Sequence, residues 1–273
     1  MVATLDQIVI ATRHRVADAK HSANLGQLER KAQEHVPRGF RRALAVRNQS
    51  GAAVIAELKK ASPSRGLIRA NFDAQDLAEQ LETAGAAALS VLTDEEFFQG
   101  SLENLRHASA RTKLPCLRKD FIVDEFQLLE ARANCADAVL LIVAVLSQAE
   151  LIALNAQGRA LGLDVLCEAH DEEELRRAVD AGCDLIGVNN RNLRTFKVDP
   201  QTTFRLAEMI PKGALGVAES GIANGTDISR LRGAGYKAFL IGESLMKAEW
   251  PSEALRCLLT EAEREPSTVS LKR

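Results

Sequence analysis

The sequence predicts an α/β protein built as one (β/α)8 barrel. Three observations support this: eight short apolar runs recur along the chain, a helical stretch follows each run, and several runs are entered by the same kind of turn. Apolar strands that alternate with helices form a parallel sheet buried on both faces. Eight such units close into a barrel more readily than they form an open sheet. The length of 273 residues also fits, since such barrels often hold about 250 residues in one domain.

The expected strands are the eight apolar runs Val54–Leu58, Ala88–Leu92, Pro115–Leu117, Ala138–Val143, Val165–Cys167, Leu185–Val188, Leu215–Ala218 and Ala238–Ile241. Four are entered by the segments TAGAAALSVL, ANCADAVLLIV, DAGCDLIGVN and GAGYKAFLIG. Three of these segments place a glycine where a left-handed helix cap is expected, and Asn134 takes that place in the other. An open, doubly wound sheet is the alternative. It usually carries a GxGxxG turn after its first strand, and KKASPSRG does not match that pattern.

The domain expected is a single one, with three parts. Residues 1–50 form a helical extension, with helices expected at Leu5–Val16, Leu25–His35 and Phe40–Val46. Residues 51–260 form the barrel, and residues 261–273 form a polar tail.

The composition is that of an ordinary globular protein, with 46% hydrophobic and 26% charged residues. A net charge of −2 gives no indication of nucleic-acid binding. The five cysteines are widely spaced without a CxxC pair, so we expect buried, reduced thiols and a cytoplasmic location. We expect neither a signal peptide nor a membrane span, and the histidines show no spacing typical of a metal site.

Charged and polar side chains follow the apolar runs, where a barrel carries its active site. They are Glu57 and Lys59 at the first run, Lys119 after the third, Glu168 after the fifth, Asn189 and Arg191 after the sixth, Glu219 and Ser220 after the seventh, and Gly242 and Glu243 after the eighth. Any one such charge, taken alone, is more simply a solvated surface group, as we also expect for Arg118. His170 is interpreted as a residue that starts a helix.

Residues two positions apart on a strand point to the same face, so Glu57 shares a face with Lys59 and Glu168 shares one with His170. The sequence therefore predicts carboxylates and lysines around one mouth, where they shift each other's pKa as acid–base chemistry requires. Glycines and serines in the last two strand loops are compatible with a phosphate site, and Ser62 in the first loop adds a hydroxyl. Simple turn glycines explain the same residues equally well.

The segments IAELKKASPSRG, LSVLTDEEFFQGS, LPCLRKDFIVDEFQ, LCEAH, IGVNNRNLRTFKVD, VAESGI and FLIGESLM resemble those of the indole-3-glycerol phosphate synthase family. The resemblance runs from about Ile55 to Met246. The parts KKASPSRG, RKDFI and NNRNL are specific to that family, whereas VAESGI and IGESLM are shared with other phosphate-binding barrels. Asn71 and Ala74 depart from the family's usual residues in the first loop, and we expect a change in loop stiffness only.

The resemblance implies a TIM barrel whose N-terminal helices lie over the barrel mouth. It implies ring closure, decarboxylation and dehydration of 1-(o-carboxyphenylamino)-1-deoxyribulose 5-phosphate in tryptophan biosynthesis, with no cofactor and no metal. Lys119 resembles the general acid of ring closure, Lys59 the partner of the substrate carboxylate and Glu168 the acid/base group of the later steps. Orienting or supporting roles are implied for Glu57, Asn189 and Arg191. Substrate binding is implied for Ser62, Phe98, Phe121, Leu140, Leu193, Glu219, Ser220, Gly221, Leu240, Gly242 and Glu243.

The partner implied is a small phosphosugar substrate, with the chain a monomer or a weak homo-oligomer. A related barrel, phosphoribosylanthranilate isomerase, is one alternative, but that family has Cys and Asp where this chain has Glu57 and Asn189. A catalytically silent barrel that serves only protein–protein contacts is another alternative. It predicts that the charged and polar residues at the strand ends have been lost. A subunit active only within a complex is a third.

Overall fold

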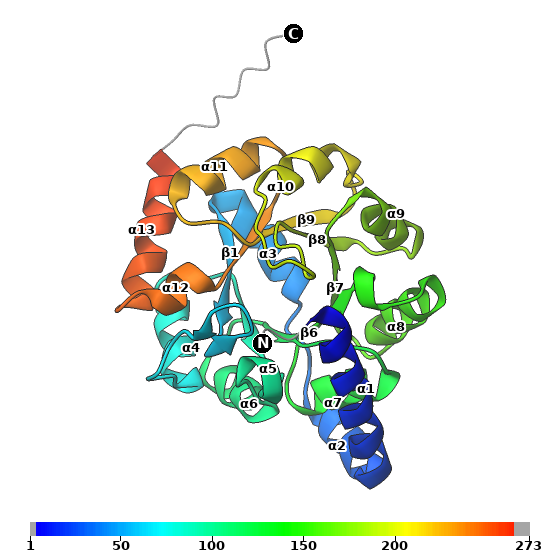
Figure 1. Ribbon diagram of the computed structural model, residues 1–273. Helices are drawn as coiled ribbons and strands as arrows, with labels where there is room; N and C mark the ends of the chain where they lie inside the picture. The colour runs from blue at the N-terminus through cyan, green and yellow to red at the C-terminus, as the bar shows by residue number, and fades with distance from the viewer. Residues whose placement is uncertain (1–3, 265–273) are drawn as a thin grey trace.

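The computed structural model describes residues 4–264 and contains a closed barrel of eight parallel strands (Figure 1). The barrel strands are β1 (Ala53–Leu58), β4 (Ala88–Leu92), β5 (Cys116–Lys119), β6 (Ala138–Ile142), β7 (Asp164–Ala169), β8 (Leu185–Asn189), β9 (Leu215–Glu219) and β10 (Ala238–Ile241). Strand β1 pairs with β4 on one side and with β10 on the other, which closes the barrel. The predicted barrel is confirmed, and the open-sheet alternative is wrong.

Eight longer helices follow the strands and surround the barrel. They are α4 (Ala74–Thr83), α6 (Leu102–Arg111), α7 (Glu125–Ala133), α8 (Gln148–Ala160), α9 (Glu172–Asp180), α10 (Gln201–Leu206), α11 (Gly225–Gly233) and α13 (Pro251–Arg264). The loops at the mouth also carry the hairpin β2 (Ala61–Ser62) and β3 (Gly66–Leu67), and the short helices α5 (Glu95–Phe98) and α12 (Glu243–Lys247). Short polar residues begin most of the longer helices. Asp124, Ser147 and Asn224, for example, each cap a helix through a capping box.

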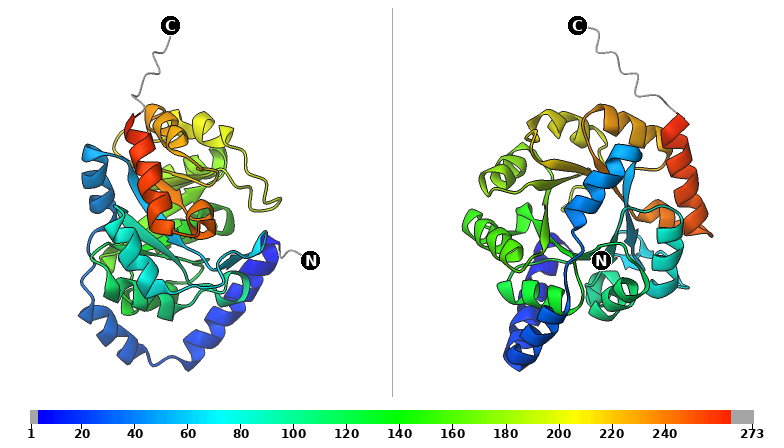
Figure 2. Two further views of the ribbon diagram at one scale, coloured as in Figure 1. Left: turned by 90° about the vertical axis from the view of Figure 1, so that its left-hand side faces the viewer. Right: turned by 180° about the vertical axis from the view of Figure 1, so that it is seen from behind.

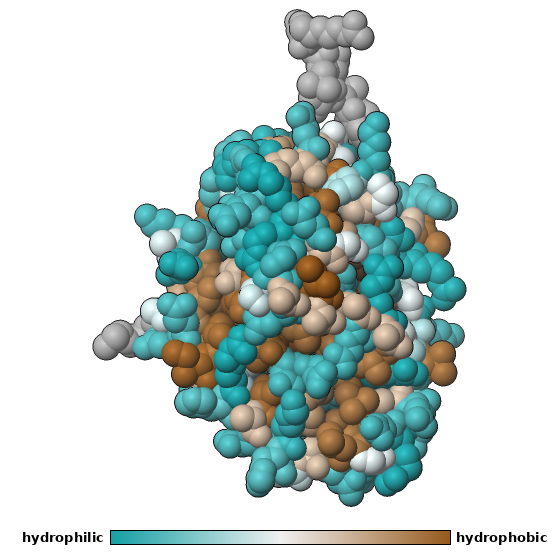
Figure 3. Space-filling model, turned by 90° about the vertical axis from the view of Figure 1, so that its right-hand side faces the viewer, coloured by the Kyte–Doolittle hydropathy of each residue, from teal (hydrophilic) through white to brown (hydrophobic). Residues whose placement is uncertain are grey.

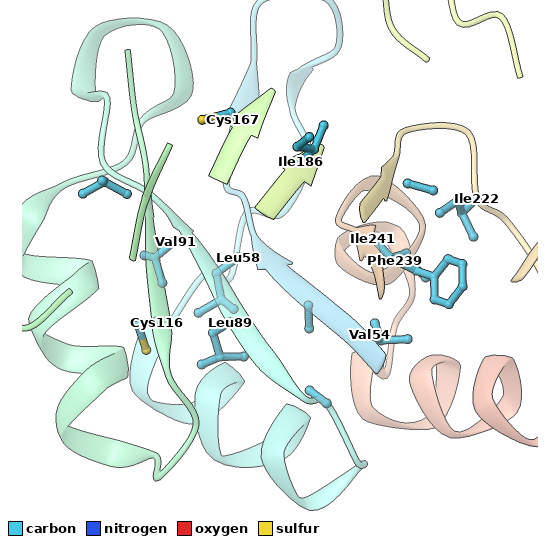
Figure 4. Close-up of a cluster of buried hydrophobic side chains, with 14 of the residues drawn as sticks. Val54, Leu58, Leu89, Val91, Cys116, Cys167, Ile186, Ile222, Phe239 and Ile241 are labelled. Carbon is cyan, nitrogen blue, oxygen red and sulfur yellow. The ribbon is translucent and has the colours of Figure 1, made fainter. Parts of the chain in front are cut away.

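The barrel has two apolar layers because alternate side chains of each strand point inward and outward. On β1, Val54, Ala56 and Leu58 pack outward against the helices, in the cluster that Figure 4 draws. Ala53 and Ile55 point inward, with Glu57 next in the same phase. The strand therefore fixes which face of the barrel Glu57 occupies.

The N-terminal helices α1 (Leu5–Ser22), α2 (Leu25–Glu34) and α3 (Phe40–Ser50) lie in three different places. Only α1 reaches the mouth, where Leu5 and Ile8 line the pocket. Helix α2 packs beside α7 on the outside of the barrel. Helix α3 lies across the opposite end, where Phe40 and Leu44 pack on the first residues of the strands (Figure 2). The extension thus covers the mouth with its first helix and the far end with its third.

A buried ion pair holds the link between α2 and α3 against the barrel. The Asp137 carboxylate accepts hydrogen bonds from the Arg38 guanidinium, at 2.6 Å to Oδ2, and from the backbone N–H of Arg38 and Cys116. His35 Nε2 lies 3.2 Å from the other carboxylate oxygen. Burial raises the pKa of Asp137, but the bonds from His35 and Arg38 lower it more, so the pKa lies below its ordinary value. The ionised carboxylate is therefore the form that stabilises this end of the barrel.

We expect Asp137→Ala to lower the free energy of unfolding by about 3–5 kcal/mol, because it leaves the Arg38 cation without its partner. Urea denaturation at pH 7 measures the loss, with the exposed Asp18→Ala as the matched control. The folded-state pKa is depressed, so this contribution is present at neutral pH and is lost as the pH falls through the folded-state pKa. Equal stability of the two variants at pH 7 would contradict the assignment.

Several details differ from the expectations. Strands β5, β8 and β9 run further than expected, and they end on Lys119, Asn189 and Glu219. Asn134 is not left-handed, because its side chain bonds to the Glu130 carbonyl and the next residue, Cys135, takes φ 65°. Residues 261–264, which were expected to belong to the polar tail, form the end of helix α13. The rest of the expected tail, residues 265–273, lies outside the described residues.

The expectation of five buried, reduced thiols is wrong in two respects. Cys167 of β7 and Cys183, in the turn before β8, form a disulfide, because adjacent strands bring the two residues together. Cys257 is exposed and Cys135 is half-buried, whereas Cys116 is buried as expected.

The molecular surface on the side of α8 and α9 is mostly hydrophilic, with smaller hydrophobic areas between (Figure 3). Ile10 of α1 and Ile152 of α8 are among the exposed apolar side chains. Within residues 4–264, no helix combines the length and the apolar character that crossing a membrane requires.

Candidate active site

A pocket opens at the carboxyl ends of the strands, on the side of the barrel that faces the viewer in Figure 1. All the candidate residues except Gly221 and Gly242 line this pocket. Those present are Glu57, Lys59, Ser62, Phe98, Lys119, Phe121, Leu140, Glu168, Asn189, Arg191, Leu193, Glu219, Ser220, Leu240 and Glu243. The barrel thus brings together residues that are up to 186 positions apart in the sequence, from Glu57 to Glu243.

Two lysines at the base of the pocket each contact a carboxylate. Lys59 Nζ lies 2.6 Å from Glu57 Oε1 on the same strand end. Lys119 Nζ lies 2.8 Å from Glu168 Oε2 and 3.7 Å from Glu219 Oε2. The Glu57, Glu168 and Glu219 side chains are almost fully buried, so these ions interact with little screening by water.

The charges around Lys119 favour different protonation states for its two carboxylate neighbours. Burial lowers the pKa of the Lys119 ammonium, but the three surrounding carboxylates raise it more, and the net pKa lies above its ordinary value. Burial raises the pKa of Glu168, but Lys119 and His170 lower it more, so Glu168 is held ionised. Burial and the nearby charge of Glu168 raise the pKa of Glu219 well above its ordinary value. The site therefore places a cation, a carboxylate that is held ionised and a second carboxyl group with a raised pKa side by side.

Arg191 and Glu243 both line the pocket, and two further cations contact Glu243 from outside the lining. Arg191 Nη2 lies 3.1 Å from Glu243 Oε2, while Arg65 and Lys247 contact the other oxygen of the same carboxylate, at 3.0 and 2.6 Å. Three cations thus converge on one anion. Asn189 Oδ1 accepts a hydrogen bond from the backbone N–H of Arg191, which fixes the start of this loop.

Serine and glycine shape the backbone in the loops after β9 and β10. Ser220 and Gly221, just after β9, have φ angles of 63° and 79°, in the left-handed region. A side chain at Gly221 would also come within 2.9 Å of Val198, so this position requires glycine on both counts. Gly242, just after β10, has an ordinary φ of −126°, but a Cβ there would lie 2.5 Å from Glu57 Oε1. Neither glycine lines the pocket, yet Gly242 leaves the space that Glu57 occupies.

The pocket also has an apolar lining. The Phe98 and Phe121 rings are 6.3 Å apart and inclined at 44°. Leu140, Leu193 and Leu240 complete this lining. The apolar side chains can pack against a flat ring, and Arg191 can pair with an anionic group.

Comparison with known proteins agrees with this geometry. Residues 5–258 match the sequence profile of indole-3-glycerol phosphate synthase. An indole-3-glycerol phosphate synthase from Koribacter versatilis is 60% identical over 259 residues, covering 95% of this chain and all of that protein. The enzyme of the same name from Burkholderia ambifaria is 49% identical, covering 92% of this chain and 97% of that protein. The chain belongs to the indole-3-glycerol phosphate synthase family. The predicted resemblance is confirmed, and the isomerase alternative is not supported.

Solved structures outside the indole-3-glycerol phosphate synthase family share the fold alone. A mandelate oxidase mutant with an FMN adduct superposes with a TM-score of 0.62 at 16% identity, covering 86% of this chain and 92% of that one. A thiamine phosphate pyrophosphorylase from Pyrococcus furiosus gives a TM-score of 0.58 at 19% identity, covering 80% and 98%. These similarities add support for the barrel.

Some pocket residues of this synthase-family chain were not predicted. Leu5 and Ile8 reach the pocket from α1, and Asp94, Asp120 and Phe196 line it from loops. The placement of α1 depends on a long-range contact, which the periodicity of one helix does not encode. Asp120, however, directly follows Lys119 and could have been included on that ground.

Helix α1 is tied to the mouth through Arg15. Its guanidinium lies 2.9 Å from Asp94 Oδ2 and 3.4 Å from Asp120 Oδ1. Asp120 also pairs with Arg118, at 3.0 Å. The expectation that Arg118 is solvated is wrong, because its side chain is only 4% exposed and holds the loop that follows Lys119.

Proposed function

We propose that this chain catalyses the indole-3-glycerol phosphate synthase reaction on 1-(o-carboxyphenylamino)-1-deoxyribulose 5-phosphate. The observation that supports this most directly is the pair of lysine–carboxylate contacts in a pocket that is also lined by apolar side chains and by Arg191. The aromatic ring would lie against the apolar side chains, and the phosphate would lie near Arg191. The reaction requires neither a metal nor a cofactor.

Ring closure joins the ring carbon that bears the carboxylate to the ketone carbon of the sugar chain. The ketone oxygen needs a proton as this bond forms, and we assign that proton to Lys119 Nζ. Lys59 would pair with the carboxylate of the substrate, while Glu57, 2.6 Å away, orients the lysine. The bond to the carboxyl group then breaks, carbon dioxide leaves, and its electron pair restores the aromatic ring.

Dehydration completes the reaction. The hydroxyl group formed from the ketone leaves as water and needs a proton, while a base removes a proton from the adjacent carbon. Glu168 is our candidate for that base, because its pKa is held low and it lies beside Lys119.

The phosphate would lie near Ser220, Gly221 and Gly242, in the loops after the last two barrel strands, where barrels often bind phosphate. Arg191 and Arg65, now paired with Glu243, could turn to the anion, and Ser62 lies on the neighbouring hairpin. Backbone N–H groups at the start of α12 can contribute as well.

We further propose that the chain is cytoplasmic and works on this small molecule as a monomer or weak homo-oligomer, without nucleic acid. The reaction is tested with purified full-length chain, after dialysis against a chelator, by following indole fluorescence on addition of the substrate. Turnover is the expected result. Substrate binding without turnover would favour the catalytically silent barrel. Absence of both binding and turnover would contradict the proposed reaction.

The space beside Gly242 gives a prediction for the same assay. Gly242→Ala places a Cβ 2.5 Å from Glu57 Oε1 and 2.9 Å from Glu57 Cβ, which must displace Glu57 and with it Lys59. We expect kcat to fall by about 100-fold, as for a misplacement of about 1 Å in a catalytic group. Gly213→Ala is the matched control, because a Cβ there meets nothing within 4 Å. Equal kcat for the two variants would show that Glu57 need not be held in this position.

A further inference from the structure

The His170 ring lies between Glu168, the candidate base, and Glu174 on the outer helix α9. It follows β7 directly, two residues after Glu168, and its side chain is 10% exposed. Nε2 lies 3.2 Å from Glu168 Oε1, an ion-pair contact in which Nε2 makes no hydrogen bond. Nδ1 lies 2.8 Å from Glu174 Oε2 on α9, and the same oxygen accepts the backbone N–H of His170. The sequence predicts only a helix-start residue here, whereas the structure also places its ring between two carboxylates.

The two oxygens of Glu168 therefore face two different cations. Oε2 faces Lys119 at 2.8 Å, and Oε1 faces His170. Burial lowers the pKa of His170, but the carboxylates of Glu168 and Glu174 raise it more, to about 10. At neutral pH the ring is an imidazolium.

Other charged groups face the same hollow on the outer side of His170. They are Asp171 at the start of α9, Arg194, Lys197 and Asp199 in the loop after β8, and Arg205 of α10. These groups carry both signs. Glu168 and Glu174 are the two carboxylates that raise the pKa of His170.

The charge balance changes during the proposed reaction. When Lys119 gives its proton to the ketone, it becomes neutral and ceases to balance Glu168. Glu57 and Glu219 lie in the same buried cluster, so the loss of one cation would favour protonation of Glu168 before it acts as a base. A second cation on the other oxygen of Glu168 prevents this.

We propose that His170, fixed by Glu174, is a positioning residue that keeps the Glu168 carboxylate ionised and oriented when Lys119 loses its proton. This role rests on the proposed function, in which Glu168 acts as the base. His170 itself touches no reacting atom. Glu174 holds Nδ1, which leaves Nε2 3.2 Å from Glu168 Oε1.

The test compares His170→Gln and Glu174→Gln with wild type over pH 5–9, with His107→Gln as the matched control. His107 is half-buried on α6, outside the pocket, and forms an ion pair with the exposed Glu103 at 3.7 Å. For His170→Gln we expect kcat at pH 7 to fall about 10-fold with KM nearly unchanged, since a cation near a carboxylate shifts its pKa by about one unit or more. The acidic limb of the kcat profile should move to higher pH, because loss of the cation raises the pKa of Glu168.

Glu174→Gln should instead change the alkaline limb. Without Glu174 the pKa of His170 falls, so the imidazolium deprotonates at lower pH and kcat declines there earlier than in wild type. A histidine NMR titration of the wild-type chain gives a readout independent of turnover and of the folding of any variant. The His170 signals, assigned by their absence in His170→Gln, should remain those of the imidazolium at pH 8.

The outcomes separate this proposal from the reaction itself. Wild-type turnover together with an unchanged kcat profile in His170→Gln would overturn the role of His170 and leave the reaction standing. A His170 ring that titrates near its ordinary pKa of about 6.5 would also overturn it, whether or not turnover is found. Absence of turnover in wild type would contradict the proposed reaction, and the role of His170, which rests on it, would be contradicted as well.

Discussion

Replacing Lys119 by methionine is expected to lower kcat by about 1,000-fold, within the range that general acids contribute. Methionine keeps the length and apolar stem of the side chain but carries no proton to donate. In the pocket, no other cation among the described residues is recorded in contact with Glu168 Oε2, and Lys59 is engaged with Glu57. Ring closure would then lack its acid, and neither carbon dioxide nor indole fluorescence should appear.

Lys113→Met is the matched control, because Lys113 is exposed and lies before β5 rather than at its mouth. Loss of Lys119 also leaves the buried side chains of Glu168 and Glu219 without the positive charge beside them. Urea denaturation must therefore show that the variant is folded under the assay conditions. A folded Lys119→Met variant that retains more than about a tenth of wild-type kcat would exclude Lys119 as the essential acid.

The barrel and the charged residues at its strand ends were predictable from local periodicity, whereas the apolar lining of the pocket was expected only from the family resemblance. Apolar runs separated by helices specify parallel strands, and the two-residue repeat of a strand places Glu57 and Lys59 on one face. Once the strands close into a barrel, their carboxyl ends meet at one mouth. The contact between Lys59 and Glu57 follows from these rules alone.

What could not be predicted depends on contacts between segments far apart in the sequence. Arg118 looks solvated in sequence because it alternates with Lys119, but α7 covers it and supplies Glu130 as a partner. Helix α3 has an apolar face that fits either end of a barrel, and only the contacts of Phe40 and Leu44 decide between them. His170 was assigned to a helix start on local grounds. Its second contact, with Glu168, depends on the side-chain directions at the end of β7.

Replacing Glu168 by glutamine should separate the early steps from the late ones. Glutamine keeps the shape of the side chain but cannot accept a proton at neutral pH. We expect turnover to indole to fall by about 1,000-fold, as for loss of a general base. In a single turnover, however, carbon dioxide should still be released, because ring closure and decarboxylation draw on Lys119 and Lys59 rather than on this carboxylate. Carbon dioxide release measured beside indole fluorescence shows this difference, and Lys119→Met should abolish both signals.

The pH dependence of wild type gives an independent check on the same residue. The pKa of Glu168 is depressed in the folded chain, so the base stays ionised at neutral pH and is lost only as the pH falls below the ordinary range of a carboxyl group. We therefore expect kcat to be level through neutral pH and to decline only at the acidic end. The exposed Glu173→Gln serves as the control for both experiments. If Glu168→Gln releases neither carbon dioxide nor indole while remaining folded, Glu168 must act already in ring closure. The most direct physical reason would then be that Lys119 cannot be held in place without the carboxylate 2.8 Å from its Nζ.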